Sequence, residues 1–403
     1  MESLLALHFL PQWPLQFDPL ISFGIVLFLA IALGELASRL RLPRISAYVA
    51  TGAALSFAKL DPALTDLLPA AHKVYELAFA LILFELGQRI DLGWLRRNPW
   101  LLATSMVESL LAFLFVGALM LIFNQTPVVA ALIAAVAAAT GPAVVLGVTR
   151  DSASRGQVTD RLQLLAALST CYSFVVVGVV YAWQHAESAA PLAVMVLHPL
   201  YLFAGSALLG GIGAWAVLNL LARIRAGNYN QTLAAVALIV VIVALANTLG
   251  LSLVLSLLAA GVLSRSLDRQ RRLQPMDFGL FSRMSLIVVF VGTGTLLDPV
   301  QFSATLVPAV GLLAARALGK GLGVFAFARP SGLPLRKASL LSIGLLPMSG
   351  AALLTVERTA ALWPEVGAQL AGVVLTALLI MEFLAPPALQ FALRRANETG
   401  ENA

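Results

Sequence analysis

Three ionisable residues stand inside long apolar stretches of the sequence, where hydrocarbon rather than water would surround them. Glu108 and Glu382 fall near the middle of two such stretches, and Lys320 is the only lysine that lies away from the ends of any of them. A carboxylate at this depth can carry a cation or a proton, or it can neutralise a buried base. Lys320 can organise a site inside the membrane, or its ammonium can extend to the inner surface.

The neighbours of Lys320 indicate a helix that packs closely on another. Arg316 lies four residues earlier and therefore on the same helical face. Gly319 and Gly323 are also four residues apart, and small residues at this spacing let two membrane helices approach each other closely. We therefore expect close helix packing at the face that carries the two glycines.

A backbone interruption at Thr140-Gly141-Pro142 divides the apolar stretch near 127–149. Pro142 has no N–H to donate to the carbonyl of Ala138, and Gly141 lowers the steric cost of unwinding. In hydrocarbon, a free carbonyl must be taken up by protein or by a water-filled cavity. The sequence therefore predicts a membrane helix that is broken in its middle.

A second interruption divides the apolar stretch near 337–357. Pro347 withholds a hydrogen bond from the carbonyl of Ile343, and Ser349 and Gly350 follow shortly after it. Two Gly/Pro-broken apolar segments at corresponding places in two halves of a chain indicate the binding site of a membrane transporter. We therefore expect the two breaks to meet at one site.

Hydroxyl and thiol side chains occur at the same depth as the breaks, namely Thr140, Ser169, Thr170, Cys171, Ser173 and Ser349. Serine and threonine in membrane helices usually bond to their own backbone, but the convergence of several of them favours a binding site. Freed carbonyls are ligands for cations, whereas the N-termini of half-helices attract anions. The breaks alone therefore do not determine the sign of a bound solute.

The composition is that of a protein embedded in a membrane. Hydrophobic residues make up 60% of the 403 residues and charged residues 11%, whereas soluble domains carry about 25% charged residues. The mean hydropathy is +0.91. Cys171 is the only cysteine and the four histidines are scattered singly, which argues against disulfides and metal sites. No catalytic cluster or cofactor motif occurs in the loops, so we expect neither an enzyme nor a bound cofactor.

We expect about thirteen membrane-spanning segments joined by short loops, near residues 19–38, 45–57, 75–92, 98–123, 127–149, 161–183, 193–221, 231–249, 251–264, 278–297, 301–328, 337–357 and 366–391. Most of the 26 lysines and arginines then fall in the loops of one side, which is the pattern of cytoplasmic loops. The opposite loops hold only Lys59, Lys73 and Arg358. The N-terminus is therefore expected outside and the C-terminus in the cytoplasm. This placement of the basic residues does not suggest nucleic-acid binding.

An odd number of segments fits two inverted repeats joined by one linker segment. The first repeat covers about 19–183, the linker about 193–221 and the second repeat about 231–391. We expect a single transmembrane domain over 1–393 and a short cytoplasmic tail over 394–403. In this arrangement the two broken segments occupy equivalent places in the two repeats.

Several short motifs occur along the chain, and their order and spacing together are specific enough to indicate a family. They are Leu40–Arg44 with Ala50–Gly52, Leu83–Leu92, Thr140–Val145, Leu251–Leu253 with Ala260–Val262, and Leu346–Pro347 with Ser349–Gly350. With these motifs the chain resembles the sodium/hydrogen exchanger-type monovalent cation:proton antiporters, in their bacterial potassium-efflux and sodium/proton branch. The resemblance extends over most of the sequence.

The resemblance implies a core of two crossing broken helices that moves against a separate dimerisation panel by alternating access. It implies a homodimer in the bacterial inner membrane that exchanges a monovalent cation, sodium or potassium, for protons. For the dimer, the linker segment carries Ser206, Gly210 and Gly213 at spacings that allow close packing. The resemblance further implies a carboxylate in the middle of the sixth segment, which carries the cation and the proton.

The sixth segment departs from the family pattern. Residues 161–185 contain no acid, and the expected polar–acid pair falls on Thr170 and Cys171. A neutral hydroxyl and a thiol cannot replace a carboxylate as cation ligand and proton carrier at neutral pH. If the chain moves protons, another group must carry them. The candidates are Lys320, Glu108 and Glu382.

Three hypotheses for the function follow from these observations. The first is a secondary transporter that exchanges a monovalent cation for protons. Its candidate ion-binding residues are Thr140, Gly141, Pro142, Thr170, Cys171, Ser173, Glu108, Lys320, Pro347, Ser349, Gly350 and Glu382. The second keeps the fold but assigns an anion or organic solute, or transport without proton coupling. The third is a transport-inactive membrane sensor or scaffold.

Overall fold

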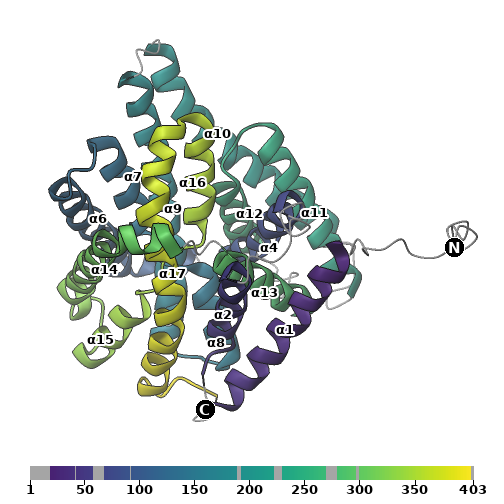
Figure 1. Ribbon diagram of the computed structural model, residues 1–403. Helices are drawn as coiled ribbons and strands as arrows, with labels where there is room; N and C mark the ends of the chain where they lie inside the picture. Colours follow the sequence, from purple (N-terminus) through teal and green to yellow (C-terminus); the bar gives the residue numbers. More distant parts are fainter. Residues whose placement is uncertain are drawn as a thin grey trace, which may run out of the picture.

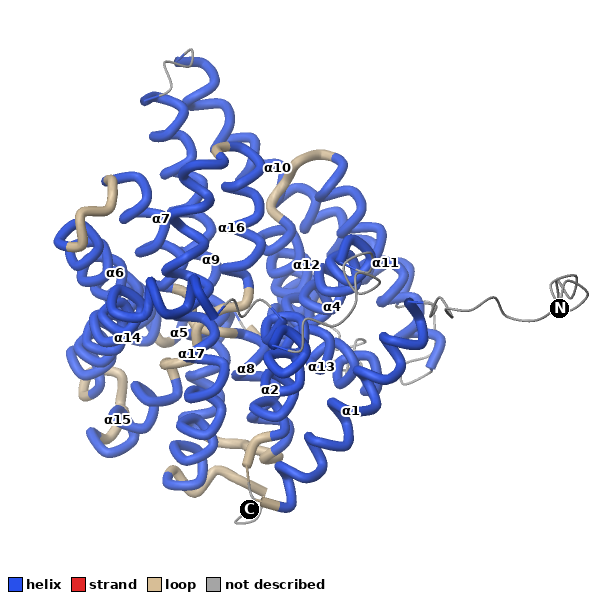
Figure 2. The backbone as a smooth tube through the Cα atoms, in the orientation of Figure 1, coloured by secondary structure: helices blue, strands red, loops and turns tan. Residues whose placement is uncertain are grey.

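The computed structural model describes residues 19–40, 42–57, 68–90, 92–187, 192–221, 229–268, 279–295 and 299–400. In this part of the chain the regular structure is helical (Figure 2). The only extended pairing among these residues is an isolated antiparallel bridge between Thr140 and Met348. The bridge joins the two predicted helix breaks. The fold class expected from the composition is therefore confirmed as all-helical for the described residues.

The helices divide into two bodies by their mutual contacts (Figure 1). The core bundle consists of α6 (Pro99–Ile122), α7 (Pro127–Ala138), α8 (Pro142–Asp151), α9 (Gln157–Glu187), α14 (Pro299–Ala328), α15 (Leu335–Gly344), α16 (Ala351–Leu362) and α17 (Pro364–Arg395). The panel consists of α1 (Pro19–Arg39), α2 (Arg44–Phe57), α4 (Leu68–Arg89), α10 (Leu192–Ala216), α11 (Tyr229–Thr248), α12 (Leu253–Leu267) and α13 (Gly279–Thr295). The short α5 (Leu92–Arg97) links α4 to α6, and a π-helical turn (Val217–Leu221) extends α10.

Each apolar segment expected from the sequence contains a helix, and the two broken segments each contain a pair, α7–α8 and α15–α16. Among the described residues, six helices are long and apolar enough to cross a membrane by themselves. They are Pro99–Ile122, Gln157–His185, Val196–Asn219, Asn230–Thr248, Phe302–Ala328 and Pro364–Arg395. The expectation of about thirteen crossings, and of inverted repeats, stays a prediction.

Local chemistry explains why the first broken segment stops and restarts. Pro127 and Pro142 each stand in the first turn of a helix, where the missing N–H is not needed. Thr126 caps α7 by accepting a hydrogen bond from Val129 N at 3.4 Å. Gly141 precedes α8 with an extended backbone, which ends the helical run between the two halves.

The close packing predicted at Gly319 and Gly323 is confirmed between α14 and α6. A Cβ atom added to Gly323 would lie 2.6 Å from the backbone nitrogen of Glu108, and one added to Gly319 would lie 2.6 Å from that of Ala112. Both positions therefore require glycine, because the backbone of α6 occupies the space of a side chain. This contact brings the polar residues of the two helices together.

The small residues of α10 face a partner other than the one expected. Ser206 accepts a hydrogen bond from Ser252 N at 3.0 Å, and a Cβ atom on Gly210 would lie 2.7 Å from the carbonyl oxygen of Ser256 in α12. A Cβ atom on Gly213 would similarly meet Ile242 of α11 at 2.7 Å. These three residues pack within the chain, so the interpretation of their spacing as a dimer contact was wrong.

Candidate functional site

The two predicted breaks meet at the centre of the core bundle. Gly141 N donates a hydrogen bond to Pro347 O at 2.9 Å, beside the bridge between Thr140 and Met348. Two short extended segments therefore cross each other, and four half-helices point away from them. The expectation that the two breaks meet is confirmed, and we call this place the crossover.

Two of the expected hydroxyl residues on α9 hold the first extended segment in place. Ser169 Oγ accepts a hydrogen bond from Thr140 N at 3.1 Å, and Thr170 Oγ1 lies 3.4 Å from Thr140 O. Thr170 also donates to Ala166 O at 2.7 Å, in the manner of a helical threonine. In the second segment, Ser349 Oγ accepts from Ala351 N at 3.3 Å, at the start of α16.

Arg316 of α14 binds the carbonyl groups of both extended segments. Its guanidinium is buried, with 1% of the residue exposed. Its hydrogen bonds go to the carbonyl oxygens of Ala137 at 2.6 Å, Leu346 at 2.5 Å, Pro347 at 2.8 Å, Ala139 at 3.0 Å and Leu345 at 3.1 Å. These carbonyls lie at or just beyond the negative C-terminal ends of α7 and α15, which stabilise a positive charge.

This role of Arg316 was not predicted from the sequence. Carbonyls freed at the breaks were expected as possible cation ligands, whereas in the structure a side chain of the protein binds the carbonyls that surround the breaks. The carbonyl of Ile343, expected to be free, accepts a hydrogen bond from Leu346 N at 3.1 Å. The signal that could have indicated the role was an arginine in an apolar segment, since such a charge needs partners inside the membrane.

Lys320 and Glu108 form a buried ion pair between α14 and α6. Lys320 Nζ lies 2.5 Å from Glu108 Oε2, with 1% and 0% of the two side chains exposed. The second carboxylate oxygen of Glu108 accepts a hydrogen bond from Ser109 Oγ at 2.9 Å. The alternative in which Lys320 extends to the membrane surface was therefore wrong, because its ammonium points into the bundle.

The ion pair lies close to the crossover along α14. Lys320 follows Arg316 by four residues, which is a rise of about 6 Å along a helix. Arg316 binds the crossover and Lys320 binds Glu108, so one helical turn separates the two contacts. A change of charge on Glu108 or Lys320 therefore changes the electrostatic potential at the crossover.

The remaining predicted residues do not join this pair in one cluster. Glu382 of α17 is 2% exposed, and its Oε2 atom has no hydrogen-bond partner among the described residues. Cys171 is half-buried and packs against the large apolar cluster that extends from α9 into the panel. Ser173 is buried on α9. Of the three candidate proton carriers, the structure thus brings together Lys320 and Glu108.

The geometry can be compared with proteins of known fold. The family model described as the transmembrane sodium/hydrogen exchanger matches residues 24–395. The chain belongs to the sodium/hydrogen exchanger family. Two solved structures of the sodium proton antiporter MjNhaP1 from Methanocaldococcus jannaschii share its fold. One, determined at pH 8, has a TM-score of 0.69 at 15% identity and covers 94% of this chain and 96% of the antiporter. The other has a TM-score of 0.68 at 19% identity, with 94% and 98% covered.

This membership confirms the family resemblance drawn from the motifs and identifies the chain as an integral membrane protein of a transporter family. It also draws attention to α9, where the resemblance implied a carboxylate. The exchanger has no acid between residues 161 and 185, and the buried carboxylate that pairs with Lys320 beside the crossover stands on α6. The chemistry of the site therefore has to be derived from Glu108, Lys320 and Arg316.

Proposed function

We propose that this exchanger is a monovalent cation:proton antiporter in which a cation and the Lys320 ammonium compete for the Glu108 carboxylate. The observation that supports this most directly is the 2.5 Å ion pair between them, buried beside the crossover. Two positive charges next to one carboxylate in hydrocarbon are strongly unfavourable. Binding of a cation therefore requires that Lys320 releases its proton, and release of the cation lets the lysine take up a proton again.

Glu108 is the best cation ligand near the crossover because Arg316 already holds the backbone carbonyls there. Oxygen atoms are the ligands that alkali cations require, and the hydroxyl of Ser109 beside Glu108 supplies a second one. A guanidinium gives up its proton far less readily than an ammonium, so Arg316 is suited to a fixed structural charge. Lys320 is suited to the exchangeable one.

The pair fixes the ratio of the exchange. With the proton on Lys320, the ion pair has no net charge, and with a cation on Glu108 and a neutral Lys320 it has none either. One cation therefore replaces one proton, and the exchange moves no net charge across the membrane. The rate should consequently be insensitive to the membrane potential.

We further propose that the core bundle moves against the panel to expose the site alternately to the two sides of a bacterial inner membrane. The distribution of basic residues supports an outside N-terminus and a cytoplasmic C-terminus.

We also propose that the exchanger forms a homodimer. Leu197, Leu208 and Trp215 of α10 expose more than half of their surface, so this apolar face contacts lipid or a second copy.

Reconstitution in proteoliposomes with a pH-sensitive dye in the lumen tests the function. Addition of sodium, potassium or lithium outside should make the lumen alkaline, and a potassium–valinomycin clamp at different potentials should leave the sodium-driven rate unchanged. The Glu108→Gln variant serves as the control for leak. Folded wild-type protein that gives no cation-dependent pH change would contradict the proposal, and a strong potential dependence would contradict the ratio of one to one.

One observation favours the second hypothesis, transport of an anion. Two buried basic groups of α14, Arg316 and Lys320, stand at or beside the crossover, and the acid Glu108 pairs with only one of them. In the same vesicles, replacement of chloride by gluconate at constant sodium separates the two functions. An anion carrier would respond to the change of anion, whereas a cation:proton antiporter would not.

A further inference from the structure

Two arginines stand at equivalent distances from the two breaks. Arg150 follows Pro142 by eight residues near the end of α8, and Arg358 follows Gly350 by eight residues in α16. Both belong to the second half-helix of a broken segment. The two half-helices run from the crossover toward opposite ends of the bundle (Figure 1). Each arginine therefore lies about two helical turns from the crossover, one at each end.

Arg150 binds the panel at one end. Its guanidinium donates to Glu85 Oε1 of α4, and Arg89 donates to the same oxygen at 3.0 Å. Arg89 also lies 3.4 Å from Gln163 Oε1 of α9, which is a second contact between the panel and the core bundle. Glu85 is only 3% exposed, so this is a largely buried, charge-assisted contact.

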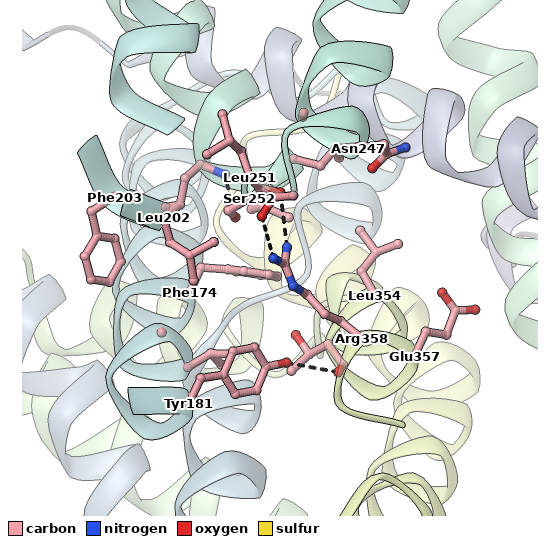
Figure 3. Close-up of a pocket in the computed structure, with 18 of the residues that line it drawn as sticks. Phe174, Tyr181, Leu202, Phe203, Asn247, Leu251, Ser252, Leu354, Glu357 and Arg358 are labelled. Atoms are coloured by element: carbon pink, nitrogen blue, oxygen red, sulfur yellow. Dashed lines mark hydrogen bonds between the residues drawn. The ribbon is translucent and has the colours of Figure 1, made fainter. Parts of the chain in front are cut away.

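Arg358 binds the panel at the other end, and its acceptors are neutral. Its guanidinium donates to Gly250 O at 2.5 Å and to Leu251 O at 3.1 Å. These carbonyls form the turn between α11 and α12. In Figure 3 the side chain of Arg358 points from α16 directly toward Leu251, whereas Glu357 lies apart from this contact. Among the residues that the structure describes, Arg358 thus joins the core bundle to the panel through backbone carbonyls.

A cavity of about 330 Å³ lies beside the Arg358 contact, and both bodies line it. Leu354 and Thr355 of α16 and Phe174 of α9 form the core side, and Leu202 of α10 lies on the panel side (Figure 3). Thr355 follows Gly350 by five residues, a rise of roughly 7 Å. The cavity therefore extends toward the crossover from the end that Arg358 holds together.

We propose that Arg150 and Arg358 are the two gate residues of this exchanger, Arg150 on the cytoplasmic side and Arg358 on the outside. The inference rests on the proposed movement of the core bundle against the panel. Opening to the outside breaks the contacts of Arg358 with Gly250 and Leu251, and opening to the cytoplasm breaks the contact of Arg150 with Glu85. Both contacts are formed in the present structure.

The chemistry of the two contacts makes the gates unequal. Arg150 binds a carboxylate, so its departure loses an ion pair as well as a hydrogen bond, although Arg89 stays bound to Glu85. Arg358 binds carbonyls, which lose less when the guanidinium leaves. The outside gate should therefore open more readily than the cytoplasmic gate, and the cavity beside Arg358 is the passage that it controls.

The test measures how fast a permanently charged, membrane-impermeant thiol reagent reaches the cavity from outside. The probe position is Leu354→Cys in a Cys171→Ser background, in right-side-out proteoliposomes. Arg358→Ala should increase the labelling rate about tenfold or more, because it removes charge-assisted hydrogen bonds that hold the outside closed. Arg150→Ala should lower the rate, because it favours the state open to the cytoplasm, in which Arg358 stays bound.

Arg161→Ala is the matched control. Arg161 donates to Ser331 Oγ at 2.9 Å and to Ser331 O at 2.5 Å, so it also binds a turn, but both partners lie in the core bundle. The labelling rate of Leu354→Cys in the Arg161→Ala variant should equal its rate in the protein with Arg161 intact. If Arg358→Ala is poorly folded, Arg358→Lys keeps the charge without the two-pronged geometry and should give a smaller increase.

A higher labelling rate in Arg358→Ala together with a lower labelling rate in Arg150→Ala supports the assignment of the two gates. An increase in both variants, or a change as large in Arg161→Ala, would indicate general loosening and overturn the inference. Unchanged labelling in Arg358→Ala and Arg358→Lys would overturn it as well. Labelling requires no transported ion, so opposite labelling changes in a protein without cation:proton exchange would retain the gates and reject the proposed substrate.

Discussion

At the scale of single residues, the site contains two buried cations that are neutralised in different ways. Arg316 is surrounded by backbone carbonyls, whose dipoles are fixed by the ends of α7 and α15. Lys320 is paired with the Glu108 carboxylate, a partner that can also bind a cation or a proton. A cation or a proton can bind to or leave the Lys320–Glu108 pair without breaking the hydrogen bonds that hold the crossover together. The exchange chemistry is therefore assigned to Lys320 and Glu108.

Neutral variants of the pair separate this chemistry from a structural role. Glu108→Gln or Lys320→Gln leaves one buried charge without its partner, which costs about 3–5 kcal/mol of unfolding free energy. Each should lower the melting temperature and abolish proton-coupled flux. The double variant should recover the melting temperature, because no lone charge remains, but it should not recover flux. Normal proton-coupled flux in the double variant would show that the pair only stabilises the fold.

At the scale of helices, the position of the ion pair depends on how closely α14 approaches α6. Gly323 lies directly against the backbone of Glu108, and Gly319 lies against Ala112 one turn further on. Side chains at these positions would push the helices apart. A longer distance between the helices would separate an ammonium from a carboxylate that cannot find water inside the bundle.

The Gly323→Ala variant tests this dependence. Its Cβ atom would lie 2.6 Å from Glu108 N and 2.7 Å from Glu108 Cβ, so α6 has to shift. We expect a loss of about 1–3 kcal/mol of stability and a strongly reduced rate of cation:proton exchange.

Gly321→Ala is the control for this test, because a Cβ atom at Gly321 meets nothing within 4 Å. Alanine favours a helix over glycine by about 0.5–1 kcal/mol, so this variant should be at least as stable as the parent. Thermal unfolding measures the change in stability, and the flux into vesicles measures the change in the rate of cation:proton exchange. Equal flux in the two variants would contradict the importance of the close contact.

At the scale of the whole molecule, a core bundle that carries the site packs against a panel across a largely apolar boundary. Phe79 and Leu83 of α4 belong to the same buried cluster as Val144 and Val145 of α8 and Leu165 of α9. Polar contacts across this boundary include the hydrogen bond that Tyr75 donates to Gly350 O at 3.0 Å, the contact of Arg89 with Gln163, and those of the two gate arginines. A boundary that is mostly apolar with few polar contacts allows the two bodies to move relative to each other.

The orientation of the molecule in the membrane can be tested with single cysteines in a Cys171→Ser background. Cysteines that replace Arg225 and Arg271 should be labelled from the cytoplasmic side, and one that replaces Lys59 should be labelled from outside. All three positions lie outside the described residues. Arg225 and Arg271 on opposite sides of the membrane would contradict the predicted topology.

The sequence by itself determined the features that depend on local covalent chemistry and on solvent. An apolar composition specifies a membrane protein, because a chain with 11% charged residues cannot cover a soluble surface. Proline and glycine specified where the two helices break, since a missing N–H has the same effect in any fold. The small-residue spacing in α14 predicted a close helix contact. The types of residue at the site, namely Glu108, Lys320 and the crossover hydroxyls, were also visible in the sequence.

Only the tertiary structure decided which of these residues act on one another. Lys320 and Glu108 are 212 residues apart in sequence, and Arg316 is 179 residues from the carbonyl of Ala137 that it binds. No local pattern records such pairings, because they follow from how α14 packs against α6 and α7. For the same reason, the small residues of α10 were assigned to a second copy although they contact α11 and α12. The partners of Arg150 and Arg358 likewise became visible only once the panel lay beside the core bundle, since a buried charge takes the acceptor that packing brings to it.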